Sequence, residues 1–127
     1  MVIKNKLVKK IKKTVVVVAL GGSSRERQVS LSSGKACVKA IKNLGYKVKT
    51  FDPRNNFFNQ INKNKVDIIF NALHGKDGED GIAQSYFEHL KIPYTHSGVT
   101  SSMKAMDKEI SKKLFFFNKI LTPNYFV

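Results

Sequence analysis

Two short glycine-rich stretches carry the side chains of this sequence that are best suited to chemistry. The first is Gly21-Gly-Ser-Ser-Arg-Glu26, and the second is His74-Gly-Lys-Asp-Gly-Glu-Asp-Gly81. Glycines let a backbone turn tightly and approach a ligand closely. The carboxylate of Glu26 suits an amine or another cation, and the imidazole of His74 suits a carboxylate or a proton transfer. These two stretches therefore hold the first candidates for a binding site.

The turn at residues 21–26 has two interpretations. Free N–H groups at the start of a helix attract negative charge, so residues 21–24 can bind an anionic group, with Glu26 on a nearby cation or amine. Alternatively, Ser23 and Glu26 have the spacing of a capping box, in which both side chains satisfy only the amides of their own helix. The glycines do not follow G-x-G-x-x-G, which argues against a dinucleotide site.

The loop at residues 74–81 is also open to a structural interpretation, with His74 as a hydrogen-bonded loop residue. Metal binding is disfavoured, because no second histidine or cysteine lies nearby at the spacing of metal ligands. Asp80 is placed to cap the helix that follows the loop. We therefore predict no metal site here.

The hydrophobic pattern predicts how these stretches are held. Residues 15–20 form a continuous apolar run, which is typical of a strand covered on both faces. Residues 26–44 have the periodicity of an amphipathic helix that Gly45 ends in a left-handed conformation. Residues 46–52 alternate between apolar and polar, as in a half-exposed edge strand, and residues 66–73 form a third strand.

The remaining pattern is weaker and predicts shorter elements. It indicates a short helix in residues 55–65, a fourth strand in residues 92–95, and helices after Asp80, after Gly98 and after the N-cap Asp107. Asn118 is expected to take a left-handed conformation, and residues 124–127 to begin another strand. The alternation predicts an α/β fold: a doubly wound, mostly parallel sheet with helices on both faces. Both glycine-rich stretches then lie at the carboxyl ends of strands, where ligands bind in such folds.

Composition narrows the possible functions. The 127 residues suit one domain, and the formal charge of +14 raises the possibility of a nucleic-acid partner. That partner is disfavoured, because lysine rather than arginine supplies most of the charge and no aromatic residues interleave with it. No apolar run is long enough to cross a membrane. The single cysteine, Cys37, fits a small apolar position in a cytoplasmic protein.

Five stretches together resemble the N-terminal domain of the D-alanine–D-alanine ligases, members of the ATP-grasp superfamily. They are Gly21-Gly-Ser-Ser-x-Glu26-Arg-x-Val-Ser-Leu-x-Ser-Gly34, Ala72-Leu-His-Gly-x-x-Gly-Glu-Asp-Gly81, Ile92-Pro-Tyr-Thr-x-Ser-Gly-Val99, Met106-Asp-Lys108 and Thr122-Pro123. They occur in the family's order and at its spacing. Gln28, where the family commonly has glutamate, and Lys119, near the family's usual glycine, depart from its pattern.

The resemblance implies a role for each matching residue. Glu26 corresponds to the glutamate that holds the amino group of the first D-alanine, and His74 to the histidine beside its carboxylate. Val29 and Ser30 match positions near the same pocket, and Lys108 matches a lysine that approaches ATP. The implied reaction uses ATP and Mg²⁺ to join two D-alanines through an acyl phosphate for peptidoglycan, although D-lactate and D-serine ligases share this pattern.

The resemblance also implies a domain division. We expect a basic leader in residues 1–13, the N-terminal α/β substrate-binding domain in residues 14–122, and the start of a truncated central ATP-grasp domain in residues 123–127. Such a fragment is expected to be inactive alone and to hold no ATP or Mg²⁺ by itself; family members commonly pair as homodimers. The alternatives are a free-standing module that binds an anion or a nucleotide at residues 21–24, and a basic nucleic-acid-binding protein.

Overall fold

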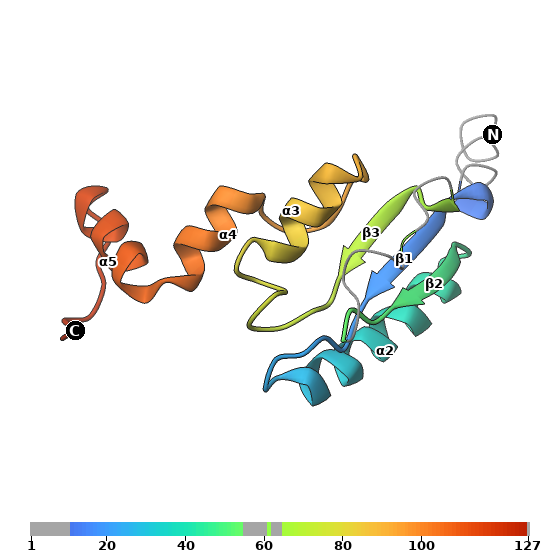
Figure 1. The fold of residues 1–127 in the computed structure, drawn as a ribbon, viewed down its shortest axis with the longest axis horizontal. Coiled ribbons are helices and arrows are strands. Elements are labelled where there is room, and N and C mark those ends of the chain that lie inside the picture. Colours follow the sequence, from blue (N-terminus) through green and yellow to red (C-terminus); the bar gives the residue numbers. More distant parts are fainter. Residues whose placement is uncertain (1–10, 55–60, 62–64, 127) are drawn as a thin grey trace.

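A three-stranded parallel sheet forms the centre of the computed structural model, which describes residues 11–54, 61 and 65–126. β1 (Val15–Ala19) lies between β2 (Lys47–Phe51) and β3 (Ile68–Asn71), and it is parallel to both (Figure 1). The edge position predicted for the second strand is confirmed. The continuous apolar run of residues 15–20 forms the central strand, because the central strand is the one with a strand on each side and a helix on each face.

Helices cover both faces of this sheet, as the alternation of elements predicted. α2 (Arg27–Asn43) packs on one face, against Val18 and Leu20, and α3 (Ile82–His89) packs on the other, against Val17 and Ala19. Successive side chains of β1 therefore enter two separate hydrophobic clusters. The α/β fold class is confirmed.

The chain then leaves the sheet through two more helices, α4 (Val99–Met106) and α5 (Lys108–Phe117) (Figure 1). Asp107 caps α5 as predicted, since its Oδ1 accepts a hydrogen bond of 2.9 Å from the amide of Ile110. The left-handed residue after α5 is Lys119, with φ of 57°, and not Asn118, whose side chain instead donates to the carbonyl of Leu114.

The predicted fourth strand is reduced to one parallel bridge between Ile69 and Tyr94. Beyond that bridge, side chains replace the backbone ladder: Thr95 Oγ1 accepts from the amide of Asn71 at 3.0 Å, and His96 Nε2 donates to its carbonyl at 2.8 Å. Residues 124–126 form no strand either. The helix predicted in residues 55–65 and most of the leader in residues 1–13 lie outside the described residues.

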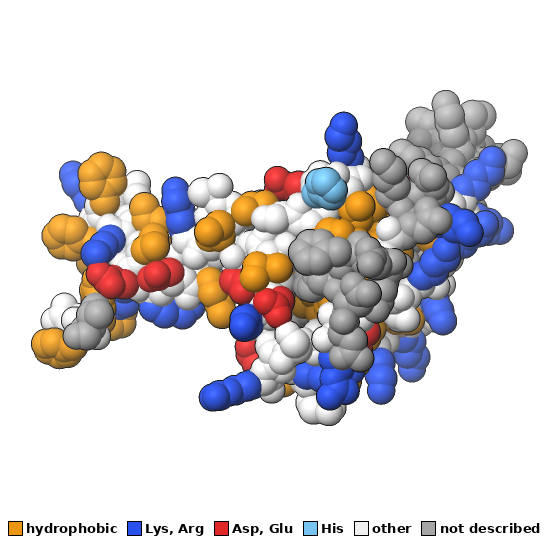
Figure 2. Space-filling view, viewed as in Figure 1, with side chains coloured by type: hydrophobic (Ala, Val, Ile, Leu, Met, Phe, Trp, Pro, Cys, Tyr) orange, Lys and Arg blue, Asp and Glu red, His pale blue; other side chains and the backbone are white. Residues whose placement is uncertain are grey.

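The surface is divided between basic and apolar regions. Exposed lysines gather over α2 and β2, while exposed hydrophobic side chains gather on α5 and the residues that follow it (Figure 2). In the described part of the chain, none of the helices has the length and apolar character needed to span a membrane.

Candidate functional site

Both glycine-rich stretches meet at the carboxyl edge of the sheet, as their places after β1 and β3 predicted. The hydroxyl of Ser24 donates to the carbonyl of His74 at 2.7 Å, and the hydroxyl of Ser23 donates to Asp77 Oδ2 at 2.6 Å. A third hydroxyl, that of the fully buried Ser30, donates to the carbonyl of Ala72 at 2.6 Å. Ser23 and Ser24 therefore join the first stretch to the second, and Ser30 makes a similar bond from α2 to the residues just before the second stretch.

The amides of the glycine turn already have partners within the chain. Gly21 and Gly22 both have positive φ, 88° and 76°, a conformation that glycine adopts readily. The amide of Gly21 donates to Ser30 Oγ at 2.8 Å, and that of Gly22 donates to Asp52 Oδ1 at 3.0 Å. These two donors are not free for an anionic ligand, because a carboxylate and a hydroxyl of the protein itself occupy them.

The predicted capping box is wrong. Glu26 is itself the residue before α2, and its side chain makes no capping hydrogen bond, while Ser23 bonds to Asp77 instead. Ser24 Oγ accepts from the amide of Glu26 at 3.1 Å. The exposed Glu26 carboxylate lies against Gly75, where a methyl group on the glycine would overlap it. The carboxylate is thus left available beside the second loop.

A paired arginine and carboxylate hold the turn from its other side. Arg27 Nη2 lies 2.7 Å from Asp52 Oδ2, Arg27 Nη1 lies 3.0 Å from Asp52 Oδ1, and Nη1 also donates to the carbonyl of Gly22 at 2.8 Å. The hydrogen bonds from Arg27 hold the pKa of the Asp52 carboxyl below its ordinary value, although partial burial opposes this change. Neither residue stands out in the sequence as a candidate for the site.

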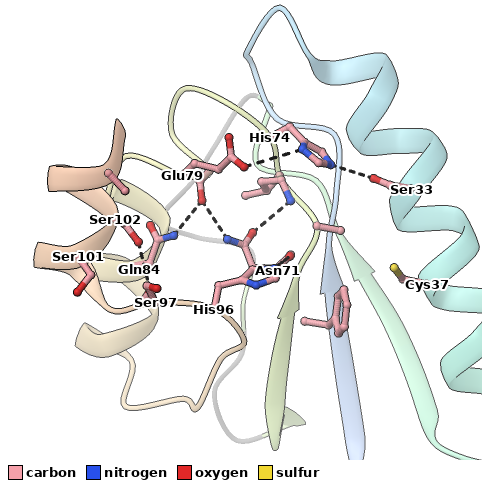
Figure 3. A pocket seen from close by; sticks show the side chains of 15 residues that line it. Ser33, Cys37, Asn71, His74, Glu79, Gln84, His96, Ser97, Ser101 and Ser102 are labelled. Carbon is pink, nitrogen blue, oxygen red and sulfur yellow. Dashed lines mark hydrogen bonds and ion pairs between the residues drawn. The ribbon is translucent and has the colours of Figure 1, made fainter. Parts of the chain in front are cut away.

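His74 extends from its loop toward α2 (Figure 3). Its Nε2 lies 3.1 Å from Ser33 Oγ, and its Nδ1 lies 4.0 Å from Glu79 Oε1. The other oxygen of Glu79 accepts from the amide of Gly75 at 2.7 Å, which fixes the carboxylate on the loop. The imidazole therefore stands between a hydroxyl and a carboxylate, in a position to donate to or accept from a ligand.

His74 lines a cavity of about 370 Å³ that extends between α2, β3 and α4. Its volume lies in the range of small-molecule sites. At its floor, Asn71 Nδ2 and Gln84 Nε2 both donate to the carbonyl of Gly78 at 2.9 Å (Figure 3). Oε1 of the buried Gln84 has no partner among the described residues. Sequence patterns could not indicate these amides, because their shared acceptor is a backbone carbonyl.

The other predicted site residues lie at different depths and distances. Val29 is exposed on α2, one turn before Ser33, whose hydroxyl donates to its carbonyl at 3.0 Å. Ser30 points inward, and its hydroxyl accepts from the amide of Gly21 and donates to the carbonyl of Ala72. Lys108 is exposed at the start of α5, with Nζ 3.5 Å from the carbonyl of Ala105. Glu26 and His74 thus lie at the same carboxyl edge of the sheet, whereas Lys108 lies on α5.

Comparisons with known proteins show which family this chain is similar to. Residues 49–97 match the family model described as the D-ala D-ala ligase N-terminus. A D-alanine–D-alanine ligase from Pelagibacter ubique is 54% identical over 87% of this chain, and one from Ruegeria is 50% identical over 79%. This chain carries the N-terminal domain of the D-alanine–D-alanine ligase family. It spans about a third of the length of these relatives, 36% and 33%.

Solved structures of the ligase family have the same fold. The crystal structure of the Bacillus anthracis D-alanine–D-alanine ligase superposes with a TM-score of 0.77 at 38% identity, and the match covers 87% of this chain and 37% of that one. A second structure of the same ligase, with the same TM-score, is complexed with ATP. The ligase resemblance that the five sequence stretches carried is confirmed.

Proposed function

We propose that this domain supplies the part of a D-alanine–D-alanine ligase that binds the first D-alanine. The observation that supports this function best is the meeting of Glu26 with the loop of His74 at the carboxyl edge of the sheet. One group there can bind an ammonium and the other a carboxylate, which are the two ends of an amino acid. The domain division at residues 13 and 122 is part of the same proposal.

The proposed reaction is ATP-dependent. ATP supplies the phosphoryl group that turns the carboxylate of one D-alanine into an acyl phosphate, and the amine of a second D-alanine displaces phosphate to form the dipeptide. Within this chain, Glu26 accepts hydrogen bonds from the ammonium of the first D-alanine, and His74 stands beside its carboxylate. Val29, which is exposed on α2, is assigned a place near the same position, while the hydroxyl of Ser30 joins the amide of Gly21 to the carbonyl of Ala72.

This chain offers fewer groups for binding ATP and Mg²⁺ than for binding D-alanine. Lys108 offers an exposed ammonium that suits a phosphate or a base nitrogen. Within residues 11–54, 61 and 65–126, no three His, Cys, Asp or Glu side chains are grouped as metal ligands would be. We assign no residue of this chain to Mg²⁺. Pairing as a homodimer stays a prediction, which sedimentation equilibrium can test.

The test joins residues 14–122 of this chain to the remaining two thirds of the Pelagibacter relative. The joined protein should form D-alanyl-D-alanine and release phosphate only when D-alanine and ATP are both present. Glu26→Gln and His74→Ala should each lower kcat/KM for D-alanine by at least about tenfold, since each removes a charge or a hydrogen bond to the substrate. Glu88→Gln, which changes a carboxylate away from both stretches, is the control. Activity equal to that of the unaltered joined protein in both variants would contradict the assignment.

A further inference from the structure

We propose that Arg27 and Asp52 act as positioning residues for Glu26, by holding the glycine turn so that its carboxylate stays beside the loop of His74. This inference rests on the proposed function and adds two residues to it. Neither side chain is placed to touch the substrate, because both are directed toward the backbone of the turn. Their effect would therefore pass through Glu26, which is the residue before Arg27 in the chain.

The contacts between the two side chains are those of a bidentate pair. Two parallel hydrogen bonds, of 2.7 and 3.0 Å, join the guanidinium to the carboxylate, and the side chains are only 22% and 34% exposed. Such a pairing fixes orientation as well as distance, unlike a solvated surface ion pair. Its orientation is fixed further because Asp52 also accepts from the amides of Gly22 and Arg54, at 3.0 and 3.1 Å.

The pair closes directly over Gly21. A methyl carbon on this glycine would lie 2.6 Å from Asp52 Oδ2 and 2.7 Å from Arg27 Nη1, so no larger residue fits beneath the pair. The same pair binds both backbone polar groups of Gly22, since Asp52 accepts from its amide and Arg27 donates to its carbonyl. With its amide and carbonyl both bound, the turn has little freedom to move Glu26.

The pair fixes the position of the Glu26 carboxylate relative to the loop of His74. Glu26 lies against Gly75, and the neighbouring Ser24 bonds to the carbonyl of His74. A shift of the turn by about 1 Å would separate the Glu26 carboxylate from the loop, and displacements of that size can lower catalytic efficiency about a hundredfold. The distance between the two substrate-binding groups thus depends on a pair that contacts neither end of the substrate.

The first experiment uses the complete 127-residue chain and needs no activity. Nuclear Overhauser contacts between the side-chain protons of Glu26 and the α protons of Gly75 report the position of the carboxylate. They should weaken or disappear in Arg27→Gln and persist in Arg25→Gln, which removes the same charge from an exposed arginine of the same turn. Unchanged contacts in a folded Arg27→Gln chain would overturn the proposal. If Arg27→Gln does not fold, Asp52→Asn, which keeps the shape of the acceptor, provides the same comparison.

The second experiment uses the joined ligase described above and separates positioning from general stability. Arg27→Gln should raise KM for D-alanine by about tenfold to a hundredfold, with a smaller effect on KM for ATP. In the Glu26→Gln background the same change should have no further effect, because a residue that acts through Glu26 cannot act without it. Additive effects would overturn the proposal. An inactive joined ligase would contradict the proposed function alone, since the Overhauser contacts decide the positioning role independently.

Discussion

The hydroxyl of Ser30 offers the sharpest test of how the candidate site is held together. Ser30 is fully buried, and its hydroxyl accepts from the amide of Gly21 at 2.8 Å while donating to the carbonyl of Ala72 at 2.6 Å. Ser30→Ala removes both bonds and leaves a buried donor and a buried acceptor without partners. Each such group costs about 1–3 kcal/mol. After allowing about 0.5 kcal/mol for the better helix propensity of alanine, the expected loss is about 2–5 kcal/mol.

Urea unfolding of the complete chain, followed by circular dichroism, measures this loss as a lower midpoint at an unchanged slope. Ser32→Ala is the matched control, because Ser32 is exposed on the same helix and the same atoms are removed. It should be neutral or slightly stabilising. A Ser30→Ala chain within about 1 kcal/mol of the control would refute the structural role, because that value is below the cost expected for two unsatisfied buried groups.

Three further predictions concern packing and charge. Gly34→Ala should lose about 1–3 kcal/mol of unfolding free energy despite alanine's helix propensity, since the new methyl carbon would lie 2.5 Å from Leu20 Cβ; thermal unfolding measures this. The pKa of Tyr94 should be about 12, because burial and then the hydrogen bond to Glu88 raise it; ultraviolet titration should show Glu88→Gln lowering that pKa. The hydrogen bonds from Arg27 lower the pKa of Asp52 from its ordinary value, so its contribution to stability should be present above the pKa of the unfolded chain and lost as pH falls through the folded pKa; urea unfolding below about pH 4 should show that Asp52→Asn flattens the stability profile.

The sheet and its covering helices were predictable from the sequence because their patterns are local. The run before Gly21 is apolar on both faces, and the periodicity after Glu26 continues for the whole of α2. Gly45, with φ of 90°, ends that helix as its residue type indicated. The meeting of the two glycine-rich stretches followed from topology alone, since parallel strands bring their carboxyl ends to one edge.

The contacts that hold the site were not predictable in the same way. Arg27 and Asp52 are 25 residues apart, and nothing in the spacing of either residue indicates the other. The capping box failed for a related reason: Ser23 has the correct local spacing, but Asp77, 54 residues away, offers its hydroxyl a charged acceptor. Hydrogen bonds to charged groups are stronger than those between neutral ones, so the tertiary contact prevailed over the local pattern.

Buried polar residues were the hardest to assign from sequence. Ser30 is one of the two buried residues of α2, the other being Gly34. The apolar stripe of the sequence did not include Ser30, and its two hydrogen-bond partners depend on how β1 and β3 end. The resemblance placed Ser30 near the substrate pocket. In the structure its hydroxyl joins the amide of Gly21 to the carbonyl of Ala72.

The helices that leave the sheet have a consequence for how the chain unfolds. The buried residue of α5 is Ser111, while Phe116 and Phe117 are 85% and 83% exposed. Regions with few buried groups open without disturbing the core. Amide hydrogens of α5 should therefore exchange with solvent far sooner than those of β1. Helical circular dichroism and a probe in the sheet should give different unfolding curves. We therefore expect α5 to unfold independently of the cooperative core around the sheet.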